Sequence, residues 1–194
     1  LPEQLHYIGT NADTLFMLNE NDHPGIADMI ITLRNWDKQG NIESKGAAVF
    51  SILYYYISGK ITSGETRYKN ITKTIAADAI GYAKNYMITN FGKTDITLGE
   101  FQKLVRGKKS IPLAGLPDVI ESMECTPYKN GMVKGNQGES YIELVKFTKD
   151  GPQIESIHSY GASNKPGNKH FDDQMERFMK QELKPMTLNK ESVY

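Results

Sequence analysis

The feature that most constrains the fold is an apolar stretch from Ala47 to Ile57, in which Ser51 and the tyrosines 54–56 are the least hydrophobic members. It falls well short of the ~18 apolar residues expected of a membrane-spanning helix. Apolar side chains nearly all round indicate a helix that is buried on every side. Ser44 precedes it as a candidate N-cap, and we expect Gly59 and Gly64 to break it. The rest of the chain must cover this central helix.

Bulk composition is that of an ordinary soluble globular protein. The 194 residues are 39% apolar and 24% charged, enough for one domain with a core or for two small ones. Lys+Arg and Asp+Glu both total 23, so charge gives no reason to expect nucleic acid or a membrane surface as partner. We therefore predict neither. The N-terminus lacks the pattern of a signal peptide, and the single Cys125 permits no internal disulfide and no zinc motif.

Three further helices are expected before residue 108. Apolar residues recur at helical spacing over 25–36 and again from Ile71 to Tyr86. The pattern Thr97-Leu-Gly-Glu100 is that of a capping box, with Phe101, Leu104 and Val105 behind it and Gly107 as the stop. Residues 1–107 are therefore predicted to be mainly helical. The Gly-, Pro- and Lys-rich segment 108–137 shows no long period and is predicted to be an irregular connection.

The C-terminal part reads as a hairpin followed by a helix. Residues 141–147 and 153–160 are rich in β-forming side chains, with 148–152 as the loop between them. Apolar residues from Phe171 to Leu183 predict a last helix. Residues 138–185 thus form a hairpin plus a helix. Helices followed by a hairpin and a helix indicate the α+β class, with the whole chain, 1–194, as a single region.

The same C-terminal segment carries a series of motifs. In order these are Gly138-Glu-Ser-Tyr141, Asp150-Gly-Pro152, Ser159-Tyr-Gly-Ala-Ser163 and Asn168-Lys-His-Phe-Asp-Asp-Gln174. They resemble the C-terminal end of the β-chain of the penicillin acylase (penicillin amidase) family, whose members are N-terminal-nucleophile amide hydrolases. Departures from the family pattern are modest: Glu139 stands for Asp, Ala162 for Gln, and Asn168-Lys169 for Ser-Pro.

Earlier blocks extend the resemblance to roughly residues 26–185. They are Leu33-x-x-Trp36-Asp37, Ser44-Lys-Gly-Ala47, Arg106-Gly107 and Ile111-Pro-Leu-Ala-Gly-Leu-Pro117. Each block alone is weak, but their order and spacing together agree with the family. Acylases of acyl-homoserine lactones and of aculeacin A look closer than the penicillin G enzymes.

The resemblance implies a portion of an αββα sandwich that lacks the reacting groups. The family nucleophile is a serine at the first residue of its β-chain, whereas residue 1 here is Leu1. Its oxyanion residues lie upstream of the Trp-Asp block. We therefore expect no catalytic residue, no metal ligand and no cofactor in this chain. Any calcium would bind in the upstream part, and the substrate-binding residues stay unknown.

The full-length protein is then expected to cleave the amide bond of an N-acylated small molecule: a β-lactam, an acyl-homoserine lactone or a lipopeptide side chain. Its partners would be the α-chain and the N-terminal part of the β-chain, together with the amide substrate. By resemblance it would be a periplasmic or secreted bacterial enzyme, and the isolated fragment would be inactive.

Two other functions stay open. A stand-alone binding module would use the 108–137 segment as its surface. An independent hydrolase would be built on His170, with Ser163 before it and Asp172 and Asp173 after it. We favour a structural His170 that caps the last helix, because a triad is defined by geometry and not by spacing. Ser140 lacks the second glycine of a nucleophile elbow, so we do not expect it to be a nucleophile.

The remaining candidates have ordinary structural interpretations. Trp36 is expected to be buried, and Asp37 is expected to cap the loop that follows it. Arg106, Lys108 and Lys109 are expected in a solvated loop. The tyrosines 54–56 either line an acyl pocket or, more commonly for a buried helix, belong to the core. The histidines outside the motif, His6, His23 and His158, show no metal-like spacing.

Overall fold

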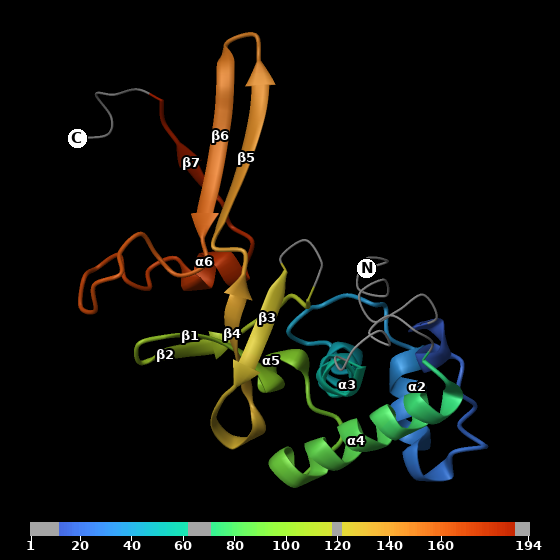
Figure 1. The fold of residues 1–194 in the computed structure, drawn as a ribbon. Helices are drawn as coiled ribbons and strands as arrows, with labels where there is room; N and C mark the ends of the chain where they lie inside the picture. Colours follow the sequence, from blue (N-terminus) through green and yellow to red (C-terminus); the bar gives the residue numbers. More distant parts are fainter. Residues whose placement is uncertain (1–11, 62–70, 118–121, 189–194) are drawn as a thin grey trace. The chain divides into compact units, whose positions relative to one another are not determined.

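The computed structural model describes residues 12–61, 71–117 and 122–188 of the chain (Figure 1). The chain forms two compact units. The first, here called the helical unit, comprises 1–103 and 112–137, and the second, the hairpin unit, comprises 104–111 and 138–194. The observed class is α+β, as the sequence predicted. That the whole chain is one region of an acylase β-chain stays a prediction.

The central helix of the helical unit is α3, Lys45–Ile61, seen end-on in Figure 1. Ala47, Val49 and Leu53 on it are fully buried. It packs against α2 (Ala27–Arg34), α4 (Lys73–Phe91) and α5 (Leu98–Phe101). Two short 3-10 helices, η1 (Ala12–Phe16) and η2 (Pro24–Ile26), precede α2. The three predicted helices around 25–36, 46–58 and 71–86 are therefore confirmed.

The ends of two of these helices differ from the prediction. α3 continues through Gly59 to Ile61, so Gly59 does not break it, and Gly64 lies outside the described residues. α4 runs on to Phe91, where Gly92 adopts a left-handed φ of 71° and donates its N–H to the carbonyl of Ile88. Glycine meets no steric penalty in that conformation, which makes it a common helix terminator.

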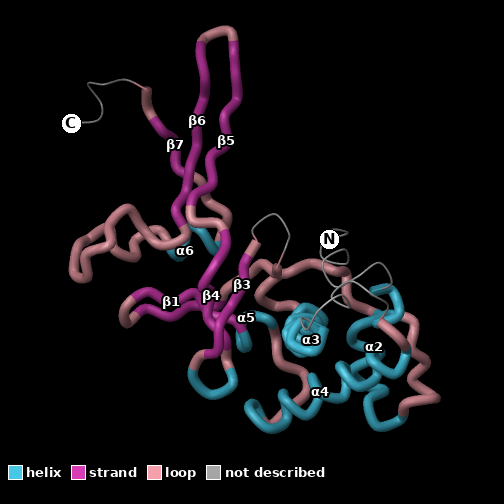
Figure 2. Tube along the Cα trace, in the orientation of Figure 1, coloured by secondary structure: helices cyan, strands magenta, loops and turns pink. Residues whose placement is uncertain are grey.

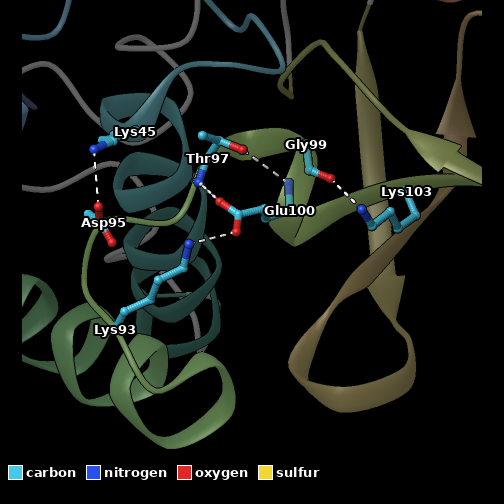
Figure 3. A network of polar contacts seen from close by, with 7 residues as sticks. All are labelled: Lys45, Lys93, Asp95, Thr97, Gly99, Glu100 and Lys103. Carbon is cyan, nitrogen blue, oxygen red and sulfur yellow. Dashed lines mark hydrogen bonds and ion pairs between the residues drawn. The ribbon is translucent and has the colours of Figure 1, made fainter.

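The predicted capping box is present (Figure 3). The N–H of Glu100 donates to the Thr97 hydroxyl over 3.3 Å, and the N–H of Thr97 donates to the Glu100 carboxylate over 2.8 Å. Lys93 Nζ also donates to that carboxylate over 2.8 Å. The hydrogen bond from Lys93 lowers the pKa of Glu100 and keeps the carboxylate charged for its capping role.

The helix behind this box is much shorter than predicted. α5 ends at Phe101, and Gln102–Arg106 form strand β1. Gln102 and Lys103 pair with Val133 and Lys134, and the Gln102 side-chain amide donates to the carbonyl oxygens of residues 113–115, at 2.9 Å for Gly115. Tertiary pairing overrides the local helical signal here. Gly107, expected to stop a helix, instead lies just after β1 with a φ of 59°.

The segment 108–137 is not irregular in its described part. It holds β2 (Lys109–Pro112), β3 (Met123–Pro127), the 3-10 turn η3 (Lys129–Gly131) and β4 (Val133–Gly138). The strands β2, β3 and β4 form a sheet with β1, of order β2-β1-β4-β3, in which β1 and β4 are parallel. Figure 2 shows β1, β3 and β4 as strands. The prediction of an irregular connection is wrong because these strands are only four to six residues long, too short to give a clear alternating pattern.

In the hairpin unit, β5 (Tyr141–Thr148) and β6 (Gly151–His158) pair antiparallel from Tyr141↔His158 to Thr148↔Gly151. The predicted hairpin is confirmed, but its turn is only Lys149-Asp150, followed by Gly151 with a φ of 109°. An unpredicted third strand, β7 (Lys184–Met186), pairs with β6. The last helix, α6 (Met175–Met179), is far shorter than the predicted 171–183.

None of the helices in the described ranges combines the length and apolar content that crossing a membrane requires.

Candidate functional site

His170, the most tempting catalytic candidate, lies in a loop before α6 and not at its N-cap. The helix begins at Met175 with Gln174 as its N-cap, so the predicted capping role is wrong. The ring Nδ1 of His170 pairs with Asp173 Oδ2 over 2.8 Å, and both side chains are substantially exposed, at 50% and 36%. Asp172, the other acidic candidate, is not the partner in this pair.

Ser163 and His170 meet through their backbones. The N–H of Ser163 donates to the carbonyl of His170 over 2.9 Å. The Ser163 hydroxyl accepts a hydrogen bond from the N–H of Lys165 over 3.2 Å. A nucleophile and its base would instead be joined by their side chains. The contacts are therefore those of a structural loop. Ser140 likewise takes part through its backbone carbonyl, which accepts from the N–H of Ser159, while its own side chain is exposed.

Arg106 contacts the loop that contains Ser163 and His170. The prediction that Arg106 is a solvated residue is therefore wrong. Its guanidinium lies 4.5 Å from the centroid of the Phe171 ring and 5.2 Å from that of Tyr160. It also donates to the carbonyl of Ser163 over 3.3 Å. Cation–π contact of this kind favours arginine over lysine.

The other two residues of the basic cluster differ from Arg106. Lys109 pairs with Glu176 of α6 over 3.2 Å, whereas Lys108 is exposed. Only Lys108 thus fits the predicted solvated loop.

Trp36 and Asp37 have the structural roles that the sequence predicted. Trp36 is 8% exposed, contacts the Phe50 ring at 5.1 Å and donates from Nε1 to the carbonyl of Gln39 over 2.9 Å. Asp37 accepts a hydrogen bond from the N–H of Gln39 over 3.0 Å.

The histidines do not assemble a metal site in the part of the chain that the structure describes. There, no group of three or more His, Cys, Asp or Glu side chains is placed to hold an ion. The ring of His158 contacts that of Tyr141, with centroids 5.0 Å apart. His6 lies outside the described residues. That this chain carries no catalytic residue or metal ligand stays a prediction.

A cavity of about 260 Å³ in the helical unit is lined largely by aromatic rings. We call it the tyrosine pocket. Its lining residues come from α3, α4, α5, β3 and β4, and they are Ile52, Tyr55, Tyr56, Tyr82, Tyr86, Phe101, Cys125, Pro127 and Val133. Of the tyrosines 54–56, the first belongs to the core, at 5% exposed, and the other two line the pocket. The core interpretation is thus confirmed for Tyr54, and that the other two line a pocket for an acyl group stays a prediction.

The rings along the pocket form a continuous series. Tyr56 and Tyr82 stack with centroids 4.2 Å apart and planes inclined by 14°. Tyr82 lies 5.9 Å from Tyr86, which meets Phe101 edge-to-face at 6.2 Å. Residues 82 and 86 are one helical turn apart on α4, so one face of that helix supplies both rings.

The polar atoms of the pocket residues are engaged with the protein. The hydroxyl of Tyr56 donates to Asp78 over 2.9 Å, and that of Tyr86 donates to the carbonyl of Gly131 over 2.8 Å. The Tyr55 hydroxyl accepts from the N–H of Cys125 over 3.0 Å. Burial raises the pKa of Tyr55 above its usual range and raises that of the Cys125 thiol to about 12. Both groups are therefore neutral at physiological pH.

Sequence reasoning missed the strand side of the pocket. Cys125, Pro127 and Val133 lie on β3 or β4 within the segment that was expected to be irregular. The spacing of the tyrosines on α4, together with the tyrosine run on α3, was the available signal for the helical side.

Comparison with known proteins agrees with the motifs. The model of the penicillin amidase family matches residues 6–194. An acyl-homoserine lactone acylase PvdQ of Pseudomonas fluorescens Pf-5 is 27% identical over 88 residues, which are 44% of this chain and 11% of that protein. The PvdQ of Pseudomonas syringae pv. tomato is 28% identical over 89 residues, 44% of this chain and 12% of that protein. The matched stretch thus spans only about an eighth of these relatives. Because the family model covers nearly the whole chain, the chain belongs to the penicillin amidase family of amide hydrolases.

Proposed function

We propose that this chain is a supporting part of an acylase that hydrolyses the amide bond of an N-acylated small molecule, such as an acyl-homoserine lactone, a β-lactam or a lipopeptide. Family membership supports the amide-hydrolase class. The named relatives support the acylated substrate, and the small share of their length that is matched supports a partial role. The remainder of the acylase supplies the nucleophile, the oxyanion hole and any calcium site.

The observation that carries this proposal is an exposed apolar face on the three-stranded sheet of the hairpin unit. Cross-strand partners in a sheet point to the same side, and alternate residues of one strand share a face. Val145 pairs with Ile154, which pairs with Met186, and Phe147 pairs with Pro152. These residues therefore form one surface, which we call the apolar face.

The apolar face is open to solvent in this chain. Phe147 is 84% exposed, Met186 45% and Val145 41%. The opposite face of the same strands is mixed: Lys146, Gln153 and Glu155 are polar, whereas Ile142, Ile157 and the 56% exposed Leu144 are apolar. Monomeric proteins rarely leave such a contiguous apolar surface uncovered.

We assign the remainder of the acylase as the occupant of this face. The acylases that resemble this chain have most of their length outside the matched stretch. A complete acylase therefore has enough further polypeptide to form a layer that covers this face. Burying the face would contribute about 25 cal/mol per Å² of apolar area. A stand-alone binding module is the less favoured alternative, because it would need a closed and mainly polar surface here.

The chemistry needs nothing from the loop around His170. An N-terminal nucleophile uses its own α-amine as base, since an amine with a pKa near ~8 accepts a proton at neutral pH. This chain then acts by packing, holding the layer that carries the nucleophile in place. We place the acylase in the periplasm or outside the cell, as the family resemblance implies.

The test compares two single substitutions in the complete polypeptide that the gene encodes. Phe147→Ser removes the largest side chain of the apolar face, whereas Lys146→Ser alters the neighbouring residue on the opposite face. We expect Phe147→Ser to shorten the half-life of acyl-homoserine lactone hydrolysis at elevated temperature several-fold, with Lys146→Ser near the parent. In the isolated chain, Phe147→Ser should leave the melting temperature unchanged. Equal half-lives for both variants would contradict docking at this face.

A further inference from the structure

We propose that the tyrosine pocket of the helical unit binds a neutral group with a single aromatic ring. The proposal is independent of the acylase function, because it concerns only residues that line this cavity. It depends on three properties of the pocket: the arrangement of its rings, its lack of charged walls and its size.

The ring arrangement favours an aromatic guest over an alkyl one. Tyr82 is 39% exposed and stacks on Tyr56 at 4.2 Å, so one of its faces is already packed and the side chain still reaches solvent. Tyr86 and Phe101 add an edge-to-face pair deeper in the series. A further ring can join this series by offset or edge-to-face contact. Such pairs gain affinity beyond that of area burial alone, on the order of three- to tenfold.

The walls of the pocket match a neutral guest. The pocket-lining residues include no lysine, arginine, aspartate or glutamate. The hydroxyls of Tyr56 and Tyr86 donate to groups of the protein, and the Tyr55 hydroxyl is engaged with the Cys125 backbone. A carboxylate in the pocket would lose its hydration without gaining an opposite charge, and that cost is large.

The volume suits a small aromatic guest. Pockets for drug-sized ligands measure roughly 300 to 1,000 Å³. The tyrosine pocket, at about 260 Å³, lies just below that range. It therefore suits a ring with a short substituent, and a larger ligand would have to extend out of the cavity.

The test measures the affinities of benzyl alcohol, cyclohexylmethanol and benzoate for the chain by ligand-detected NMR. We expect benzyl alcohol to bind at least threefold more tightly than its saturated analogue cyclohexylmethanol. Benzoate should not bind measurably.

Two matched variants locate the binding. Tyr82→Leu removes the stacked, partly exposed ring. It should weaken the binding of benzyl alcohol at least fivefold, with little change in the melting temperature of the chain. Tyr141→Leu removes a tyrosine of similar exposure, 41%, from the hairpin unit and should leave the affinity unchanged. Equal affinities for the aromatic and saturated alcohols, or parental affinity in Tyr82→Leu, would overturn the proposal. So would a complete absence of binding by NMR.

Discussion

The hydroxyl oxygen of Tyr55 accepts a hydrogen bond from the backbone N–H of Cys125 across 3.0 Å, and this bond ties α3 to β3. Tyr55→Phe would leave that N–H without its partner in a largely buried place. Leaving a buried donor unsatisfied costs about 1–3 kcal/mol. We expect a loss of that size in the free energy of unfolding, measured by urea denaturation.

Tyr82→Phe is the matched control for Tyr55→Phe. It removes the same hydroxyl from a side chain that is 39% exposed. Its effect on the free energy of unfolding should stay within about 0.5 kcal/mol, as for most surface changes. Similar losses in the two variants would show that the Tyr55–Cys125 hydrogen bond does not contribute to the free energy of unfolding.

A second prediction concerns the contact between Trp36 and Gly46. A Cβ at Gly46 would lie 2.3 Å from the Cβ of Trp36, so even alanine does not fit. Trp36→Ala should cost about 3–5 kcal/mol, as other large-to-small core changes do. Gly46→Ala should cost about 1–3 kcal/mol through overpacking.

Gly25→Ala is the control for Gly46→Ala, because a Cβ at Gly25 would have nothing within 4 Å. It should leave the denaturation midpoint close to that of the parent. If Gly46→Ala were tolerated as well as Gly25→Ala, the packing of Trp36 described here would be wrong.

The sequence predicted the helical core because its signals are local. The apolar run of α3, the periodicity of α2 and α4 and the capping box at Thr97 each need only neighbouring residues to be recognised. The family motifs were also recognisable from short runs of sequence. They identified the family, and none of them corresponds to a family motif that carries a catalytic residue.

The sequence did not predict the strands between residues 102 and 137. Their pairing is non-local: β1 meets β4 in parallel, with Gln102 opposite Val133. A capping box followed by apolar residues is typical of a longer helix, yet the chain pairs with residues 133 and 134 from Gln102 onward. The strand side of the tyrosine pocket was missed for the same reason.

The third prediction is a pH dependence from the Glu20–Arg34 pair. Arg34 donates to the two oxygens of Glu20 over 3.0 and 2.5 Å, and these bonds lower the pKa of Glu20 from its usual 4.5 to about 2. As the pH falls, the Glu20 carboxylate is protonated at a higher pH in the unfolded chain than in the folded chain. The stabilisation by the pair is therefore fully present above pH 4.5 and disappears as the pH falls to about 2.

Glu20→Gln tests this dependence. The difference in melting temperature between parent and variant should shrink steadily through that pH window. It should also shrink in ~1 M salt, which screens exposed pairs. A difference that stays constant from neutral pH down to the acid limit would contradict the role of the pair.

The fourth prediction separates the backbone of the His170 loop from its side chain. A Cβ at Gly161 would lie 2.3 Å from the carbonyl oxygen of His170, so Gly161→Ala must displace the loop backbone. His170→Ala removes only a half-exposed pair with Asp173 and should cost less than about 1 kcal/mol. Thermal denaturation should therefore rank Gly161→Ala as clearly more damaging. The reverse ranking would mean that the imidazole, and not the backbone, holds the loop.

The most direct test of the central claim measures the rate of acyl-homoserine lactone hydrolysis by this chain alone and by the complete polypeptide that its gene encodes. We predict no turnover above buffer for the 194-residue chain, clear turnover for the complete polypeptide, and activity within a few-fold of the parent for His170→Ala in the complete form. Turnover by the isolated chain that His170→Ala abolishes would contradict the supporting role proposed here and would establish an independent hydrolase.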